Sequence, residues 1–325
     1  MKRNNFNKMS NLSRKPRALV VFSGGLDSTL ASIILQKARC EVGVLTFISA
    51  FFNADKARVT AKSLGIKFYS EDFTNEHLEI VKNPPNGWGK HINPCIDCHA
   101  LMFAIANKIR KKKKYDFIAT GEVLGQRPFS QNKQALRRVE KAANLVGHIL
   151  RPLSAKLLPV TEIEKNLEKK GFDLRKNLLD ISGRSRKRQL QLAEKFRLTN
   201  FPSPGGGCIL TDPGYSVRAK ALLELNKSAD SNDFEIIKHG RFYNHKNGIV
   251  MVGRQHDENL ILEKLTQKND YLIRLKNIAG PLALLRIYNQ NESVKNAIEF
   301  TKEKVKKHAT KAHNVNNVEY DILKI

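Results

Sequence analysis

Hydrophobic and polar residues alternate along the first part of the chain in blocks that predict a parallel sheet. Arg17–Phe22 and Glu41–Phe47 are short apolar runs, as expected for strands buried on both faces. Between them lies a segment with helical spacing that ends near Arg39. A second helix is predicted over residues 53–64, and a third strand at Lys67–Tyr69. This β-α-β-α-β order predicts an α/β fold with a doubly wound parallel sheet.

The same reasoning extends the first domain to about residue 225. A helix is predicted from Cys98 to about Lys113, a strand at Asp116–Thr120, and helices over 161–170 and 185–197. The composition turns polar over residues 226–232, which predicts a domain boundary there. We therefore expect a main domain over residues 17–225.

The last part of the chain predicts a smaller α+β domain over residues 233–325. Its strand-like runs include Gly248–Gly253 and Leu282–Ile287, and a helix is predicted over Glu292–His308. At the other end, Met1–Arg17 holds six basic residues and no acidic ones. We expect residues 1–16 to be a disordered basic arm.

The charge points to a polyanionic partner. The chain has 325 residues, with 57 Lys+Arg against 31 Asp+Glu and a net charge of +26. A nucleic acid is the first expectation for such a protein, and an ordinary solvated basic surface is the alternative. No apolar run approaches the ~20 residues that span a bilayer, so no membrane partner is expected. The N-terminal segment lacks the apolar core of a secretory signal, and we expect a cytoplasmic protein.

The segment Ser23-Gly-Gly-Leu-Asp-Ser28 follows a predicted buried strand and opens a helix. Gly24 and Gly25 allow a phosphate to approach the backbone, and the helix N-terminus offers free N–H groups to an anion. Ser23 and Ser28 can add hydroxyl hydrogen bonds, and Asp27 is placed to hold Mg²⁺. The lysine of the kinase-type phosphate loop is absent. A glycine-rich strand-to-helix turn with a capping serine is the alternative.

This string resembles the PP-loop of the ATP pyrophosphatase superfamily, whose members have a Rossmann-like fold. The resemblance implies cleavage of ATP to AMP and pyrophosphate while a carbonyl oxygen is adenylated. It implies ATP and Mg²⁺ as cofactors, bound by Ser23 to Ser28. We also assign Phe47 and Gly121, which end the second strand and follow the Asp116–Thr120 strand, to the nucleotide site.

Three of the four cysteines could act together. Cys95 and Cys98 are three residues apart at the start of a predicted helix, where thiol pKa values are lowered, and Cys208 follows a Gly-rich turn. Three thiolates on a [4Fe–4S] cluster would leave one iron open for an exogenous sulfide. A closed zinc site would need a fourth ligand, for which His99 and Cys40 are the candidates. Three unrelated buried cysteines are the remaining alternative.

Asn93-Pro-Cys-Ile-Asp-Cys-His99 resembles the N-P-x-x-x-C-N motif of tRNA 2-thiouridylases, and the resemblance covers about residues 17–215. It implies that Cys98 and Cys208 are catalytic. Cys95 stands where those enzymes have Asp, which favours a cluster-dependent mechanism like that of the iron–sulfur tRNA thiolases. Glu122 stands where they have His, so a nucleotide contact at this position is not carried over.

Two basic runs and one turn are predicted to bind RNA. The turn lies in Val252–Asn259, which resembles part of the NFACT-type RNA-binding domain through its G-R-x-x-x-x-N string. Solvated helix faces and an ordinary polar turn are the alternatives. The predicted RNA-binding residues are Lys111, Lys112 and Lys113, then Arg184, Arg186, Lys187 and Arg188, and in the turn Arg254.

Together these features predict an ATP-dependent tRNA uridine sulfurtransferase. The sulfur donor would be sulfide or a persulfide carrier, and a homodimer is left open. In one alternative Cys98 carries a persulfide and Cys208 resolves it. A second alternative is an RNA-binding protein that has lost catalysis, and a third is a PP-loop ligase for a small molecule.

Overall fold

A computed structural model describes residues 14–198, 208–289, 293–315 and 317–325, which leaves most of the predicted basic arm outside the described residues. The chain forms two compact units. The first holds residues up to Gly89 and Asn93–Gly207, and the second holds Lys90–Ile92 and Cys208–Ile325.

The first unit contains a five-stranded parallel sheet of order β3-β2-β1-β4-β5. The chain leaves β1 toward one side and later returns to pair β4 on the other, which confirms the predicted doubly wound α/β fold. Its strands are β1 (Arg17–Val21), β2 (Glu41–Ile48), β3 (Lys67–Asp72), β4 (Phe117–Thr120) and β5 (Ile149–Leu150). Its helices are α1 (Leu26–Lys37), α2 (Asp55–Ser63), α3 (Thr74–Lys82), α4 (Cys95–Lys112), α5 (Lys133–Ala142), α6 (Glu162–Lys169) and α7 (Lys187–Lys195).

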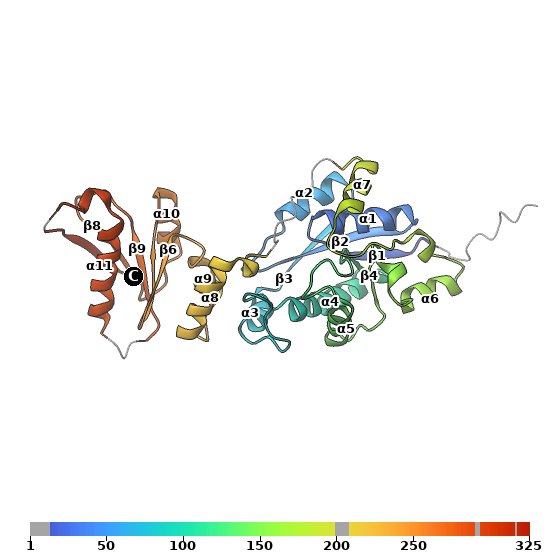
Figure 1. Ribbon diagram of the computed structural model, residues 1–325, viewed down its shortest axis with the longest axis horizontal. Coiled ribbons are helices and arrows are strands. Elements are labelled where there is room, and N and C mark those ends of the chain that lie inside the picture. Colours follow the sequence, from blue (N-terminus) through green and yellow to red (C-terminus); the bar gives the residue numbers. More distant parts are fainter. Residues whose placement is uncertain (1–13, 199–207, 290–292, 316) are drawn as a thin grey trace, which may run out of the picture. The chain divides into compact units, whose positions relative to one another are not determined.

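Helices cover both faces of this sheet (Figure 1). Buried side chains of α1, α2, α6 and α7 form one core with the sheet, and those of α4 and α5 form another on the opposite face. This explains why the central strands are apolar throughout: Ala18, Leu19 and Val20 of β1 are all fully buried.

The second unit has a five-stranded antiparallel sheet of order β10-β8-β9-β7-β6. Its helices make it the α+β unit that the sequence predicts. The strands are β6 (Arg241–His245), β7 (Gly248–Val252), β8 (Tyr271–Leu275), β9 (Ala283–Ile287) and β10 (Tyr320–Lys324). The helices are α8 (Pro213–Leu225), α9 (Ser231–Ile236), α10 (His256–Lys264) and α11 (Val294–His308).

The helix α8 belongs to the second unit, although the polar segment 226–232 that follows it was predicted to be the boundary. The Tyr215 hydroxyl donates to the carbonyl of Phe234 at 2.9 Å, and Arg218 donates to that of Ile237 at 2.9 Å. Polar composition marks the turn between α8 and α9, whereas the division between the units falls before Cys208.

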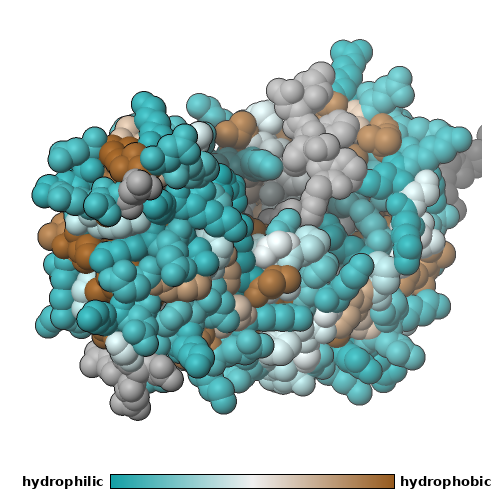
Figure 2. Space-filling view, turned by 60° about the vertical axis from the view of Figure 1, so that its left-hand side comes forward, coloured by the Kyte–Doolittle hydropathy of each residue, from teal (hydrophilic) through white to brown (hydrophobic). Residues whose placement is uncertain are grey.

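The visible surface is mostly hydrophilic, with small and separated hydrophobic patches (Figure 2). Exposed apolar side chains such as Val59 and Val217 are scattered, which is normal for a protein surface. Among the described residues, no helix is both long and apolar enough to cross a membrane.

In α3, a histidine is buried in an aromatic cluster. His77 is fully buried, stacks on Phe73 with ring centroids 4.8 Å apart, and meets the edge of Phe51. Neither ring nitrogen has a hydrogen-bond partner among the described residues. Burial lowers the pKa of His77 to about 4. A charged ring would lose its hydration there, and no hydrogen bond from the part of the chain that the structure describes compensates for that loss.

This burial predicts a pH-dependent stability. The unfolded chain protonates His77 below pH ~6.5, whereas the folded protein resists until about pH 4, so stability falls as the pH falls through that window. We expect His77 to lower the free energy of unfolding of the first unit by about 2 kcal/mol between pH 7 and pH 5. Urea unfolding of His77→Phe should lack this component, whereas the exposed His148→Gln should retain it. Equal pH profiles of wild type and His77→Phe would contradict this assignment.

Candidate functional site

The loop Ser23–Ser28 lies at the carboxyl end of β1 and leads into α1. The amide of Gly25 donates to Ser23 Oγ at 3.3 Å, and Ser28 Oγ donates to the carbonyl of Gly25 at 3.0 Å. Gly25 is the N-cap of α1 and has no side chain to cap the first N–H groups. A helix N-terminus with uncapped donors is suited to an anion.

Two glycines at this loop are required by neighbouring backbone. Gly24 has φ +72°, and a Cβ there would lie 2.7 Å from Cα of Ala57 in α2. A Cβ on Gly121, directly after β4, would lie 2.4 Å from the amide nitrogen of Ser28. Gly121 was predicted to bind the nucleotide. In the structure it brings the end of β4 against the loop, so it also shapes the site.

Asp27 presents a carboxylate oxygen that the protein leaves unused. Gln126 Nε2 donates to its Oδ2 at 2.9 Å, and Arg186 Nη2 lies 3.9 Å from the same oxygen. Oδ1 is buried without a hydrogen-bond partner among the described residues. An orphaned carboxylate oxygen beside a phosphate loop fits a hard cation such as Mg²⁺.

The cysteine pair lies at the same edge of the sheet. Helix α4 precedes β4 of a parallel sheet, so its first turn lies at the carboxyl ends of the strands. Cys95 and Cys98 are in that first turn, and the Cys98 side chain is 8% exposed. Asn93 Nδ2 donates to Cys95 Sγ at 3.1 Å.

The expected lowering of the thiol pKa is wrong for Cys95. Burial raises the pKa of this thiol, and the hydrogen bond from Asn93 and the charge of Arg127 lower it by less. Sequence spacing places Cys95 at a helix N-terminus, but the low dielectric of its surroundings outweighs that effect.

A buried polar chain holds α4 against β4. His99 Nδ1 lies 2.9 Å from Glu122 Oε1, and Arg151 Nε donates to Glu122 Oε2 at 3.0 Å. Arg151 also pairs with Glu140 of α5. Burial alone would raise the pKa of Glu122, but Arg151 and His99 lower it below its ordinary value. Glu122 therefore positions the start of α4 through His99. The sequence motifs did not reveal this role, because its other partner, Arg151, lies in none of them.

The predicted metal ligands are only partly assembled. In the part of the chain that the structure describes, no three His, Cys, Asp or Glu side chains gather closely enough to hold a metal ion. Cys95 and Cys98 belong to the first unit, and Cys208 begins the second, directly after a predicted turn that lies outside the described residues. Cys40 precedes β2 at the opposite edge of the sheet, and burial raises its pKa to about 12. Cys40 is therefore a core residue and not a fourth ligand.

Phe47 was predicted to contact the nucleotide, but its ring is in the core. It is 3% exposed and packs against Phe73 with ring centroids 5.0 Å apart. The structure thus gives this side chain a packing role.

The two basic runs of the first unit lie at opposite edges of its sheet. Lys111, Lys112 and Lys113 are exposed at the end of α4. There Arg17, the first residue of β1, donates to the carbonyl of Lys113 at 3.3 Å, which marks the amino edge. The run Arg184–Arg188 instead leads into α7 at the carboxyl edge, where Arg186 approaches Asp27.

In the second unit, the string around Arg254 has structural functions. A Cβ on Gly253 would lie 2.0 Å from Asn259 Oδ1, which accepts a hydrogen bond from the amide of Leu282 at 3.1 Å. The Arg254 guanidinium donates to the carbonyl of Gly240 at 2.8 Å, and half of its side chain is exposed. Gly253 and Asn259 therefore brace β7 against the chain before β9, and Arg254 retains an exposed face.

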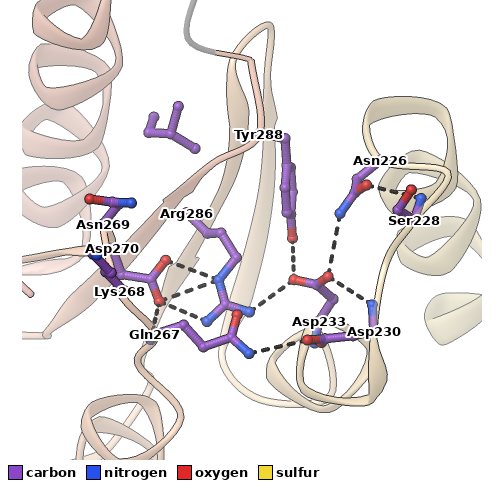
Figure 3. A pocket seen from close by; sticks show the side chains of 11 residues that line it. Asn226, Ser228, Asp230, Asp233, Gln267, Lys268, Asn269, Asp270, Arg286 and Tyr288 are labelled. Atoms are coloured by element: carbon purple, nitrogen blue, oxygen red, sulfur yellow. Dashed lines mark hydrogen bonds and ion pairs between the residues drawn. The ribbon is translucent and has the colours of Figure 1, made fainter.

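The second unit also contains a polar pocket of about 270 Å³ (Figure 3). Arg286 donates to Asp270 Oδ2 at 2.7 Å and to Asp233 Oδ1 at 2.9 Å, and the Tyr288 hydroxyl donates to Asp233 Oδ1 at 2.7 Å. These charges satisfy one another across α9, β9 and the start of β8, which is what a structural brace requires.

The doubly wound sheet and the Ser23–Ser28 loop define the first unit as a PP-loop nucleotide-binding domain. Residues 14–156 match the family model described as thiamine biosynthesis protein (ThiI), so this part of the chain is a ThiI-family domain.

Individual relatives match less than half of the chain. A tRNA sulfurtransferase of Desulfurococcus amylolyticus is 34% identical over 151 residues, which is 44% of this chain and 30% of the relative. A probable tRNA sulfurtransferase of Geobacillus thermodenitrificans is 27% identical over 162 residues, 47% of this chain and 38% of the relative. The chain thus spans about a third of the length of these relatives. Among solved structures, a 4-thiouridine synthetase–RNA complex with bound ATP is 23% identical, with a TM-score of 0.38, covering 56% of this chain and 52% of that one.

Proposed function

We propose that the protein is an ATP-dependent tRNA uridine sulfurtransferase that forms 2- or 4-thiouridine. One observation carries the proposal: an uncapped phosphate loop with Asp27 and the pair Cys95 and Cys98 lie at the same edge of one sheet. The similarity of residues 14–156 to the ThiI family, and of the matched region to tRNA sulfurtransferases, supports it.

In the first step, a uridine carbonyl oxygen attacks the α-phosphorus of ATP, and the bond between that phosphorus and pyrophosphate breaks. The backbone N–H groups at the start of α1 bind the phosphates. Asp27 would hold Mg²⁺ through its unused oxygen, and the ion would supply positive charge against the phosphates. The adenylated carbonyl carbon then has AMP as a good leaving group.

In the second step, a sulfur nucleophile attacks that carbon and AMP leaves. In the cluster route, Cys95, Cys98 and Cys208 would supply the three thiolates that a [4Fe–4S] cluster with one open iron requires. In the persulfide alternative, the terminal sulfur of a Cys98 persulfide attacks the carbon. Cys208 then attacks Cys98 Sγ, so that the S–S bond breaks, the transferred sulfur leaves with the uridine, and a Cys98–Cys208 disulfide forms. The resulting disulfide would need an external thiol for its reduction.

Mass spectrometry of tRNA nucleosides from cells with and without the gene tests the proposed function. We expect one thiouridine species to disappear, and its identity gives the modified position on the base. Purified protein should release pyrophosphate from ATP faster with tRNA than without it. An unchanged thionucleoside profile together with no tRNA-stimulated release would favour a non-catalytic RNA-binding protein.

Cys95→Ala separates the two sulfur routes. A cluster would lose one of three ligands, so we expect sulfur transfer to fall to background and the visible absorbance of an anaerobically reconstituted protein to disappear. Under the persulfide route, activity should stay within about threefold of wild type, since Cys98 and Cys208 remain. Cys40→Ala is the matched control, because Cys40 lies at the other edge of the sheet.

A further inference from the structure

The segment before α7 is anchored at the phosphate loop. Ser182 forms a parallel bridge with Leu124, and the amide of Gly183 donates to the carbonyl of Leu124 at 2.8 Å. Gly121, three residues before Leu124, packs directly against Ser28 of the loop. This attachment fixes the run that follows at the carboxyl edge of the sheet.

Within this run, one arginine differs from its neighbours. The Arg186 side chain is 18% exposed, and its Nε is buried without a hydrogen-bond partner among the described residues. Arg184 and Lys187 are exposed, and Arg188 is exposed and paired with Asp180 at 2.7 Å. The neighbours thus have the environment of an ordinary solvated basic run, and Arg186 does not.

The contact with Asp27 leaves much of the Arg186 guanidinium unused. Its 3.9 Å distance from Asp27 Oδ2 is too long for a hydrogen bond, and Gln126 already donates to that oxygen. A partly buried guanidinium with an unpartnered Nε is suited to a further anion. The phosphate loop beside it presents N–H groups to the same kind of ligand, and the planar fork of arginine matches phosphate oxygens.

We infer that Arg186 binds the β- and γ-phosphates of ATP and is not one of the RNA-binding residues. The inference rests on the proposed function, since it assigns a further residue to the same nucleotide site. When the bond between the α-phosphorus and pyrophosphate breaks, the electron pair and the negative charge go to the pyrophosphate. Arg186 stabilises that charge.

Calorimetric titration of the full chain with MgATP and with AMP tests this assignment. We expect Arg186→Gln to weaken MgATP binding about 10- to 100-fold, which corresponds to one or two charge-assisted hydrogen bonds. AMP binding should change less than twofold, because AMP lacks the β- and γ-phosphates. Arg186→Lys keeps the charge without the fork and should restore part of the loss. Lys195→Gln, an exposed change in α7, should bind MgATP like wild type.

The outcomes separate this inference from the proposed function. If wild type binds neither MgATP nor AMP, the proposed function fails and the inference falls with it. If wild type binds MgATP and a folded Arg186→Gln binds it equally well, the inference alone is overturned. Filter binding of tRNA provides the second readout: Arg186→Gln should keep wild-type affinity, whereas Arg184→Gln should weaken it. If Arg186→Gln lost tRNA binding but kept MgATP binding, Arg186 would be an RNA-binding residue, as the sequence predicts, and the inference would be overturned.

Discussion

Asp27→Asn should reduce tRNA-stimulated pyrophosphate release about 100-fold or more. The amide keeps the size of the side chain and can still accept a hydrogen bond from Gln126, so the fold should be preserved. It removes the negative charge and the free carboxylate oxygen on which Mg²⁺ binding depends, and a bound metal ion contributes several kcal/mol to transition-state stabilisation. Pyrophosphate release is measured at saturating MgATP and tRNA.

The matched control is Asp55→Asn, which changes an exposed carboxylate in the first turn of the neighbouring α2. It should retain wild-type activity. If Asp27→Asn kept more than about a third of the wild-type rate, Asp27 would not be a metal ligand, and its contact with Gln126 would be purely structural.

Arg286→Leu should destabilise the second unit by about 3–5 kcal/mol. Arg286 is 4% exposed, and its removal leaves the carboxylates of Asp233 and Asp270 buried without their main partner. Breaking a buried ion pair from one side has a cost of this size, because the remaining charge stays in a low dielectric. Urea unfolding followed by far-ultraviolet circular dichroism measures the change.

Arg274→Leu is the control for this variant. Its 3.5 Å contact with Asp321 is between exposed side chains, so its loss should cost no more than about 1 kcal/mol. If the two variants were equally stable, the network around Arg286 would be the wrong explanation for the order of the pocket in Figure 3.

Local pattern was sufficient for the parallel sheet but not for the division of the chain. Strands such as β1 are apolar throughout because both faces of the sheet are covered. An apolar run of this kind can be recognised from a few consecutive residues. The boundary depends instead on what α8 packs against, and Tyr215 reveals this only through its bond to Phe234, 19 residues away. The polar segment 226–232 marks a turn, which has the same composition as a linker.

The candidate site shows the same contrast. Ser23 to Ser28 were found from sequence because the phosphate loop is contiguous. Arg186 is grouped with Arg184 and Arg188 in the sequence because charge runs look uniform there, and only its burial beside Asp27 distinguishes it. The raised pKa of Cys95 was missed for a related reason: sequence shows a helix start but not the desolvation around it.

The helix α4 has a consequence for the minimum size of a substrate. It has 18 residues, so its two ends are about 27 Å apart. The cysteine pair is at one end and Lys111–Lys113 at the other. An RNA that places a base at the cysteines while its backbone contacts those lysines must cover that span. A folded RNA has this reach, whereas an isolated nucleoside or a dinucleotide would engage one end of the helix only.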